Sequence, residues 1–276
     1  MPELPEVQTV VNDLNAAGLK GAVISGARVF WPRSIATPGI RTFYRQIKGK
    51  KISEIWRRGK FLVFDFTSGY FMMIHLRMSG RIHLVSADAE RQKHEHVVIS
   101  FEDGRQLRFH DTRKFGRIYL VKNPEKILGK LGVEPLAPTF TTKSLKNLKA
   151  RKRLLKPLLL DQTVIAGLGN IYVDEALWEA KIHPCRIAST LSDAEIKALH
   201  RTIPLVLKRG LKNLGTSLGT GKANFYSVAR RKGRNTDELK VFRRTGMPCP
   251  RCGHAIERII VGQRSTHICR RCQKII

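Results

Sequence analysis

The sequence predicts an α+β protein of several domains: an N-terminal helix with an antiparallel β-sandwich, a helical domain, and a small C-terminal β-hairpin module. Short strand-like segments separated by Gly, Asp and Ser fill the region up to about residue 121. Helical patterns replace them from about residue 123, and four of the five cysteines lie within the last 28 residues. The 276 residues can form separate cores, and we expect domains at 1–122, 123–240 and 241–276.

The N-terminal part is expected to begin with a helix and to continue as strands. Residues 5–17 place valine and leucine at helical spacing, and Gly18 supplies a stop. The segments with strand composition are 61–66, 70–76, 96–101 and 116–121. Their number and spacing are typical of an antiparallel sandwich or barrel.

The second part has helical patterns at 125–132, 143–160, 169–180 and 192–214. Ser192 is a suitable N-cap, and Glu195 completes a capping box. Pro204 should kink or divide the last of these helices.

The charge balance indicates a polyanionic partner. Lys and Arg number 51 against 22 Asp and Glu, which gives a net charge of +29. Neutralising phosphates on this scale releases condensed counterions; the alternative is a highly charged surface that only keeps the protein soluble. No apolar run is long enough to span a membrane, and the N-terminus lacks the apolar segment of a signal peptide, so we do not expect export.

The C-terminal cysteines have the spacing of a structural zinc site. Two C-x2-C motifs are separated by sixteen residues, and the stretch between them reads as two strands around Gly262 and Gln263. We therefore expect a β-hairpin zinc finger that holds one ion through Cys249, Cys252, Cys269 and Cys272. Cys185 lies outside this set and is expected to be an ordinary buried thiol.

Two other features could bind phosphate. Arg264 lies in the donor-rich turn of the expected hairpin, where the alternative is a solvated turn. Gly167 and Gly169 precede a helix that starts near Asn170, and such a helix N-terminus offers free N–H groups to an anion. An ordinary helix hairpin would have the same local pattern.

The motifs, taken together and in order, resemble those of formamidopyrimidine-DNA glycosylase. This family belongs to a bacterial base-excision superfamily that also contains the endonuclease VIII group. The matching stretches are "MPELPEV" (1–7), "RRGKFL" (57–62), "HLRMSGRI" (75–82), "KHEHVV" (93–98), "DTRKFGR" (111–117), "GLGNIYVDEALW" (167–178) and the cysteine hairpin. The resemblance implies a bifunctional glycosylase and AP lyase that excises 8-oxoguanine and formamidopyrimidines from damaged double-stranded DNA.

The resemblance also assigns the catalytic residues. Removal of Met1 would expose the secondary amine of Pro2, and an α-amino group has a pKa near 7.7–8.0, so part of it is unprotonated at neutral pH. Pro2 then resembles the nucleophile that forms a Schiff base at the sugar C1′, and Glu3 the general acid. Lys60 resembles the proton donor in β-elimination, whereas a lone lysine there would more often be a solvated strand end.

Further positions correspond to family residues that support catalysis or bind DNA. Glu6 is expected to order the N-terminal site, and Arg264 to grip a phosphate and assist δ-elimination. Once the damaged base has flipped out, three side chains are expected to fill the hole in the duplex: Met78, Arg113 and Phe115. The positions that correspond to backbone-phosphate contacts are His94, Arg151 and Asn170. Core packing is the alternative for Met78 and Phe115, and a charged helix face is the alternative for Arg151.

The chain departs from the family pattern over residues 215–244, the region that caps the extruded base. It is unusually basic at 229–234. Two alternatives therefore stay open: a glycosylase for oxidised pyrimidines, and a catalytically inactive DNA-binding relative. We expect a monomer that does not bind membranes and acts in the cytoplasm at the nucleoid.

Overall fold

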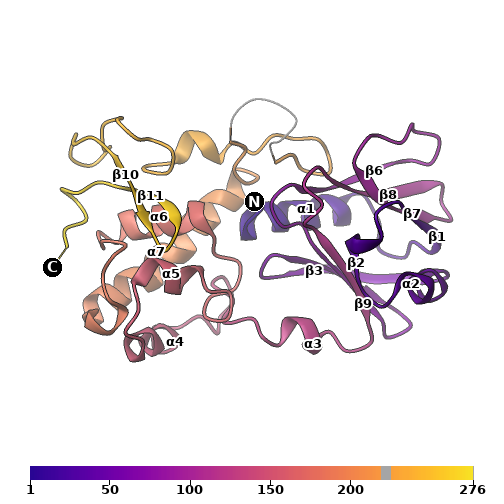
Figure 1. Ribbon diagram of the computed structural model, residues 1–276, viewed down its shortest axis with the longest axis horizontal. Coiled ribbons are helices and arrows are strands. Elements are labelled where there is room, and N and C mark those ends of the chain that lie inside the picture. The colour runs from indigo at the N-terminus through magenta and orange to yellow at the C-terminus, as the bar shows by residue number, and fades with distance from the viewer. Residues whose placement is uncertain (219–224, 276) are drawn as a thin grey trace. The chain divides into compact units, whose positions relative to one another are not determined.

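The structure is a computed structural model that describes residues 1–218 and 225–275 (Figure 1). By their internal contacts the described residues group into two units. The first comprises Met1–Lys130 and Asn213–Arg234, and the second Leu131–Lys212 and Asn235–Ile276. The division into domains at 122 and 240 stays a prediction.

The N-terminal helix is confirmed as α1 (Leu4–Ala16). Glu3 is its N-cap and forms a capping box with Glu6, which satisfies two backbone N–H groups that would otherwise lack partners. The helix ends before Gly18, whose φ of 68° suits glycine. The proline within its first turn is Pro5, so Pro2 precedes the helix and has no role in starting it.

The first unit contains two sheets, as expected for a β-sandwich. The five-stranded sheet has the order β2 (Ile35–Thr37), β9 (Arg117–Val121), β5 (Phe71–His75), β4 (Phe61–Phe66), β3 (Ile52–Arg58). The four-stranded sheet has the order β1 (Ile24–Val29), β7 (Glu95–Phe101), β8 (Arg105–Asp111), β6 (Gly80–Ser86). Neighbouring strands are antiparallel except for β2 and β9. One core joins α1 to both sheets through side chains that include Val10, Phe64, Ile99 and Phe109.

The strands expected from the sequence correspond to β4, β5, β7 and β9. The helix α2 (Ile40–Ile47) was not expected; it buries only Phe43 and Ile47 and is too short for a clear periodic signal. The first unit also contains the short helices η1 (Pro32–Ser34) and α3 (Glu125–Leu128).

The second unit is helical and ends in a two-stranded hairpin. Its helices are α4 (Thr142–Lys146), η2 (Asn147–Ala150), α5 (Leu155–Leu160), α6 (Asn170–Glu179), η3 (Ala188–Thr190), α7 (Asp193–Lys212) and η4 (Asn235–Glu238). The hairpin strands are β10 (Glu257–Val261) and β11 (Arg264–Ile268), as the sequence predicted. Ser192 and Glu195 form the expected capping box of α7.

One helix prediction was wrong, and one of the two outcomes expected at Pro204 is excluded. Residues 143–160 do not form one helix, because Arg151 is extended and Leu154 pairs with Ile187 in an isolated bridge. Arg151 therefore does not lie on a helix face. Pro204 does not divide α7, since a buried apolar stripe that includes Ile203 and Leu207 holds the helix on both sides of it. Across the part of the chain that the structure describes, no helix has the length and apolar character of a membrane span.

Candidate functional site

The N-terminal segment is buried and is held by Glu6. Pro2 and Glu3 are both buried beside it. One carboxylate oxygen of Glu6 accepts the backbone N–H of Glu3 at 2.8 Å, and the other accepts that of Thr216 at 2.7 Å. A Cβ at Gly215 would lie 2.9 Å from the Glu6 side chain, so only glycine permits this approach. Glu6 thus fixes the backbone next to Pro2 against residues 215–216.

Lys60 lies at the tip of the β3–β4 hairpin, where Arg58 pairs with Phe61. Arg57 ties this tip to α1, because its guanidinium donates to the Gln8 side chain at 3.0 Å and to the Gly59 carbonyl at 2.9 Å. Lys60 is only 5 % exposed, so the solvated strand-end interpretation is wrong.

His75 is a buried residue next to Lys60 that the sequence analysis missed. Burial, followed by the charges of Arg77 and Lys60, lowers the pKa of His75 to about 3. The ring is therefore neutral at physiological pH, and its Nδ1 accepts the backbone N–H of Arg77 at 3.0 Å. That contact places the ring proton on Nε2. No local sequence pattern separates this histidine from an ordinary strand residue.

The loops that carry Met78, Arg113 and Phe115 are joined by one carboxylate. Asp111 is fully buried. One of its oxygens accepts from the Ser79 hydroxyl and from the backbone N–H of Arg113, and the other accepts the N–H of Gly116 at 2.7 Å.

The side chains on these two loops are exposed. Met78 is 45 % and Phe115 46 % exposed, so core packing is wrong for both. The Arg113 guanidinium lies over the Phe115 ring at 4.9 Å. The first unit therefore presents two exposed apolar side chains and a cation on neighbouring, anchored loops.

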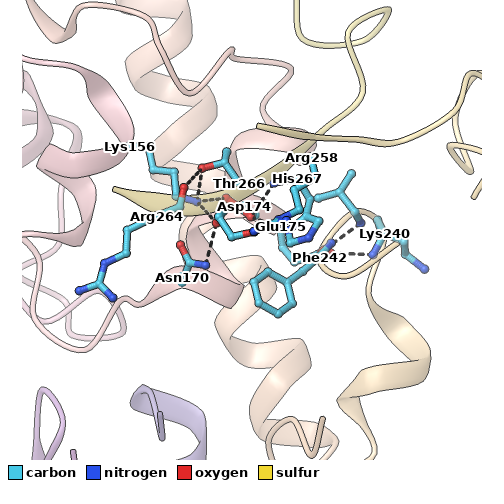
Figure 2. A network of polar contacts seen from close by, with 12 residues as sticks. Lys156, Asn170, Asp174, Glu175, Lys240, Phe242, Arg258, Arg264, Thr266 and His267 are labelled. Atoms are coloured by element: carbon cyan, nitrogen blue, oxygen red, sulfur yellow. Dashed lines mark hydrogen bonds and ion pairs between the residues drawn. The ribbon is translucent and has the colours of Figure 1, made fainter. Parts of the chain in front are cut away.

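In the second unit, buried charges connect α5 and α6 to the hairpin (Figure 2). Lys156 and Asp174 form an ion pair at 2.6 Å, and neither side chain is exposed. Lys156 also donates to the Ser265 carbonyl and to the Thr266 hydroxyl. The second oxygen of Asp174 accepts the backbone N–H of His267 at 2.9 Å. Each charge thus has several partners, which a buried ion pair needs to offset its desolvation.

This network sets the surroundings of Arg264 and Asn170. Arg264 is exposed and starts β11, directly before the residues that Lys156 holds. Asn170 begins α6 and donates to the Ser265 carbonyl at 2.9 Å. The structure therefore brings Asn170 and Arg264 together through Ser265, as Figure 2 shows. Arg151 is exposed at the end of η2 and does not take part in these contacts.

Glu175 holds a second stretch of backbone in this unit. Its carboxylate accepts the N–H groups of Lys240, Val241 and Phe242 at 2.8 to 2.9 Å. Burial raises the pKa of Glu175, and these three hydrogen bonds oppose the rise. Phe242 in turn packs edge-to-face against His267, with ring centroids 5.0 Å apart.

The four cysteines of the C-terminal motifs meet, as expected for zinc. Their sulfur atoms all lie within 4.8 Å of one another. The Cys252 Sγ lies 3.4 Å from that of Cys269 and 3.5 Å from that of Cys272. Tetrahedral bonds of about 2.3 Å to zinc place sulfurs about 3.8 Å apart, so the residues fit one structural ion. Cys185 is apart from this set and half-buried, and burial raises the pKa of its thiol.

Three family models match the chain in order. They are the formamidopyrimidine-DNA glycosylase N-terminal domain over residues 1–118, the H2TH domain of the same enzymes over 131–221, and a zinc finger found in FPG and IleRS over 246–275. The chain is therefore a DNA glycosylase of the class that combines a helix-two-turn-helix domain with a zinc finger.

Individual relatives narrow this class. The chain is 49 % identical over 275 residues to formamidopyrimidine-DNA glycosylase of Protochlamydia amoebophila, covering 99 % of this chain and 100 % of the relative. It is 44 % identical to that of Pelotomaculum thermopropionicum over the full length of both. A Lactococcus lactis FPG variant in complex with Fapy-dG-containing DNA superposes with a TM-score of 0.92 at 38 % identity, covering 99 % of this chain and 100 % of that one. This protein belongs to the formamidopyrimidine-DNA glycosylase family.

We predict that Asp111→Ala destabilises the first unit by about 3 kcal/mol, because it leaves buried N–H groups without an acceptor. Urea unfolding followed by tryptophan fluorescence measures this. The control is Glu102→Ala, which removes the neighbouring exposed carboxylate from the β7–β8 turn and should cost less than about 0.5 kcal/mol. Equal losses in the two variants would show that Asp111 does not hold the loops.

Zinc removal tests the C-terminal module. We expect one zinc ion per chain, and we expect Cys249→Ser or a chelator to unfold the hairpin and to weaken DNA binding, because metal binding and folding are coupled in such modules. Cys185→Ser is the matched control and should retain the metal. Active protein with well under one zinc per chain contradicts the assignment.

Proposed function

We propose that Pro2, once Met1 is removed, is the nucleophile with which this enzyme excises oxidised purines from double-stranded DNA and then cuts the strand. The observation that carries the proposal is the burial and anchoring of the N-terminal segment by Glu6. A fixed secondary amine can meet the sugar C1′ without a large ordering cost. The glycosylase function itself follows from family membership.

The proposed reaction proceeds in two stages. The Pro2 nitrogen forms a bond to C1′ while the bond from C1′ to the base breaks, and the base leaves with that electron pair and takes up a proton. The nitrogen then loses its own proton, and Glu3 protonates the sugar ring oxygen as the ring opens. The product is an iminium ion that acidifies the hydrogens on C2′. Loss of a C2′ proton expels the 3′ phosphate by β-elimination, and a second elimination expels the 5′ phosphate. We assign the proton transfer of β-elimination to Lys60, which is buried in the first unit beside the neutral His75.

The DNA would contact both units. Met78, Arg113 and Phe115 would enter the hole left by the flipped nucleotide, since they are exposed and mutually anchored. Arg264 and Asn170 would hold backbone phosphate, with their spacing set by the Lys156–Asp174 network.

The relatives favour oxidised purines over the two alternatives. The matched structures include FPG complexes with DNA that contains Fapy-dG and with DNA that contains an abasic site, and the residues that correspond to the catalytic set are intact in this chain. Residues 219–224 of the base-capping region lie outside the described residues. We propose that the enzyme acts as a monomer at the nucleoid, where its DNA substrate lies.

Borohydride trapping tests the nucleophile. On duplexes that carry 8-oxoguanine, Pro2→Gly should greatly reduce the covalent adduct, and Glu3→Gln should block base release. Pro5→Ala is the control, since Pro5 lies within the first turn of α1, and it should retain trapping. Mass spectrometry that places the wild-type adduct on a lysine contradicts the assignment of Pro2.

Comparing alanine variants of two arginines, which have equal charge, distinguishes phosphate binding from lesion recognition. Arg264→Ala should weaken binding to damaged and undamaged duplexes alike and reduce the salt slope by about one counterion. Arg113→Ala should mainly impair binding to lesion-containing DNA, and should change opposite-base discrimination by about 1–3 kcal/mol. Binding is measured on matched duplexes across a salt series. Identical behaviour of the two variants would contradict the role given to Arg113.

A further inference from the structure

Residues 225–234 form a small hairpin that is fastened to α1; we call it the 225–234 hairpin. The Ser227 N–H donates to the Arg231 carbonyl at 3.0 Å, and Tyr226 and Lys232 form a bridge. The buried carboxylate of Asp13 on α1 accepts the Ala229 N–H at 3.0 Å and pairs with the Arg231 guanidinium. The basic stretch noted in the sequence is therefore a defined element of the first unit.

Arg230 lies at the tip of this hairpin in a conformation that disfavours it. Its φ is 57°, and its N–H donates to the Ser227 carbonyl at 2.9 Å. Glycine or asparagine is favoured at such a position, and another residue there costs about 1–2 kcal/mol. The other basic residues with positive φ in the described part of the first unit are Arg77, His94 and Lys114, in loops at one end of the four-stranded sheet. Strained positions of this kind gather at functional sites.

The hairpin lies against β6 at the same end of the sheet. The Arg81 guanidinium lies over the Tyr226 ring, 5.7 Å from its centroid. Arg81 pairs in register with His110, directly next to the Gly80–Asp111 pair from which the Met78 and Arg113 loops depart. Arg81 thus lies next to the base of the two loops that carry Met78 and Arg113, which we propose enter the DNA.

A row of basic side chains joins His94 to the hairpin. The His110 ring lies 5.8 Å from the His94 ring and 5.6 Å from the His83 ring. Burial, followed by the charges of His83, Arg81 and His94, lowers the pKa of His110 to about 4, and Glu95 opposes this decrease. Burial likewise lowers the pKa of His83, against the effect of Glu95, and the charges of Arg81 and Arg230 add to the decrease. The Arg81 and Arg230 cations both act on His83 and therefore lie at the same place, so a bound anion would relieve the repulsion between them.

We propose that Arg230 and Arg81 bind a backbone phosphate of the DNA, next to the phosphate contact assigned to His94, and that the 225–234 hairpin presents this additional contact. The inference rests on the proposed function. A phosphodiester carries one negative charge and accepts the paired N–H groups of a guanidinium. The anchoring by Asp13 limits the ordering cost when DNA binds.

The test uses Arg230→Gly and Arg230→Ala in the full-length zinc-loaded protein. The probe is a duplex with a tetrahydrofuran abasic analogue, and its dissociation constant is measured across a salt series. Both variants should bind about 5- to 10-fold more weakly at low salt, with a salt slope reduced by about 0.9 for one lost phosphate contact. The melting temperature of Arg230→Gly should equal or exceed that of the wild type, because glycine suits the positive φ.

The matched control is Arg45→Ala, which removes an exposed arginine from α2. It should change the affinity for DNA by less than about 2-fold, because salt screens long-range charge effects.

A scan of single neutral methylphosphonate linkages shows which phosphate Arg230 contacts. One linkage should weaken wild-type binding clearly more than it weakens binding by Arg230→Ala, which keeps only the Arg81 contact. Equal salt slopes for the Arg230 and Arg45 variants, or the absence of such a linkage, overturn the inference. Borohydride trapping of the wild type on the 8-oxoguanine duplex tests the proposed function separately, since it does not depend on this contact.

Discussion

Buried carboxylates hold the functional segments of this strongly basic protein in place. Seven of the 22 acidic residues are buried, whereas only four of the 51 Lys and Arg are buried in the described part of the chain. The buried acids are Glu3, Glu6, Asp13, Glu95, Asp111, Asp174 and Glu175. A buried carboxylate is costly unless charges or N–H groups satisfy it, so each of them constrains the backbone around it. Their removal from the surface also leaves the exterior more positive, which favours a polyanion.

The segments held in this way are those that carry the proposed chemistry. Glu6 fixes the backbone at Pro2, and Asp111 fixes the two loops that carry exposed side chains. Asp174 fixes β11 behind Arg264. In each case the carboxylate binds backbone N–H groups, so side chains nearby stay available for DNA. The four-thiolate site holds the β10–β11 hairpin in place through a metal ion. Such preorganisation reduces the entropy that is lost on binding.

Local patterns predicted much of the fold. The spacing of apolar residues gave α1 and α6, and the cysteine spacing gave the hairpin and its metal ligands. The break at Arg151 was missed, because it depends on pairing between Leu154 and Ile187, which are far apart in sequence. Long-range contacts of this kind have no local signature.

The site was less predictable than the fold. The local pattern at Pro2 and Glu3 does not differ from that before an ordinary helix. Their roles as nucleophile and general acid therefore came only from the resemblance to a family. His75, Lys156 and Asp174 gave no signal, since their importance comes from burial beside residues distant in sequence. The Asp174 carboxylate and the His267 N–H are separated by 93 positions.

Amide-resolved hydrogen exchange by NMR tests the role of the carboxylates most directly. The amides of Gly116, Thr216, Ala229 and Val241 lie outside the named helices and strands and donate to Asp111, Glu6, Asp13 and Glu175. If the carboxylates hold these segments, the four amides exchange at least about 100-fold more slowly than exposed turn amides, because each exchanges only when the structure around it opens. Exchange of these four amides at the rate of exposed turns would contradict this role of the carboxylates.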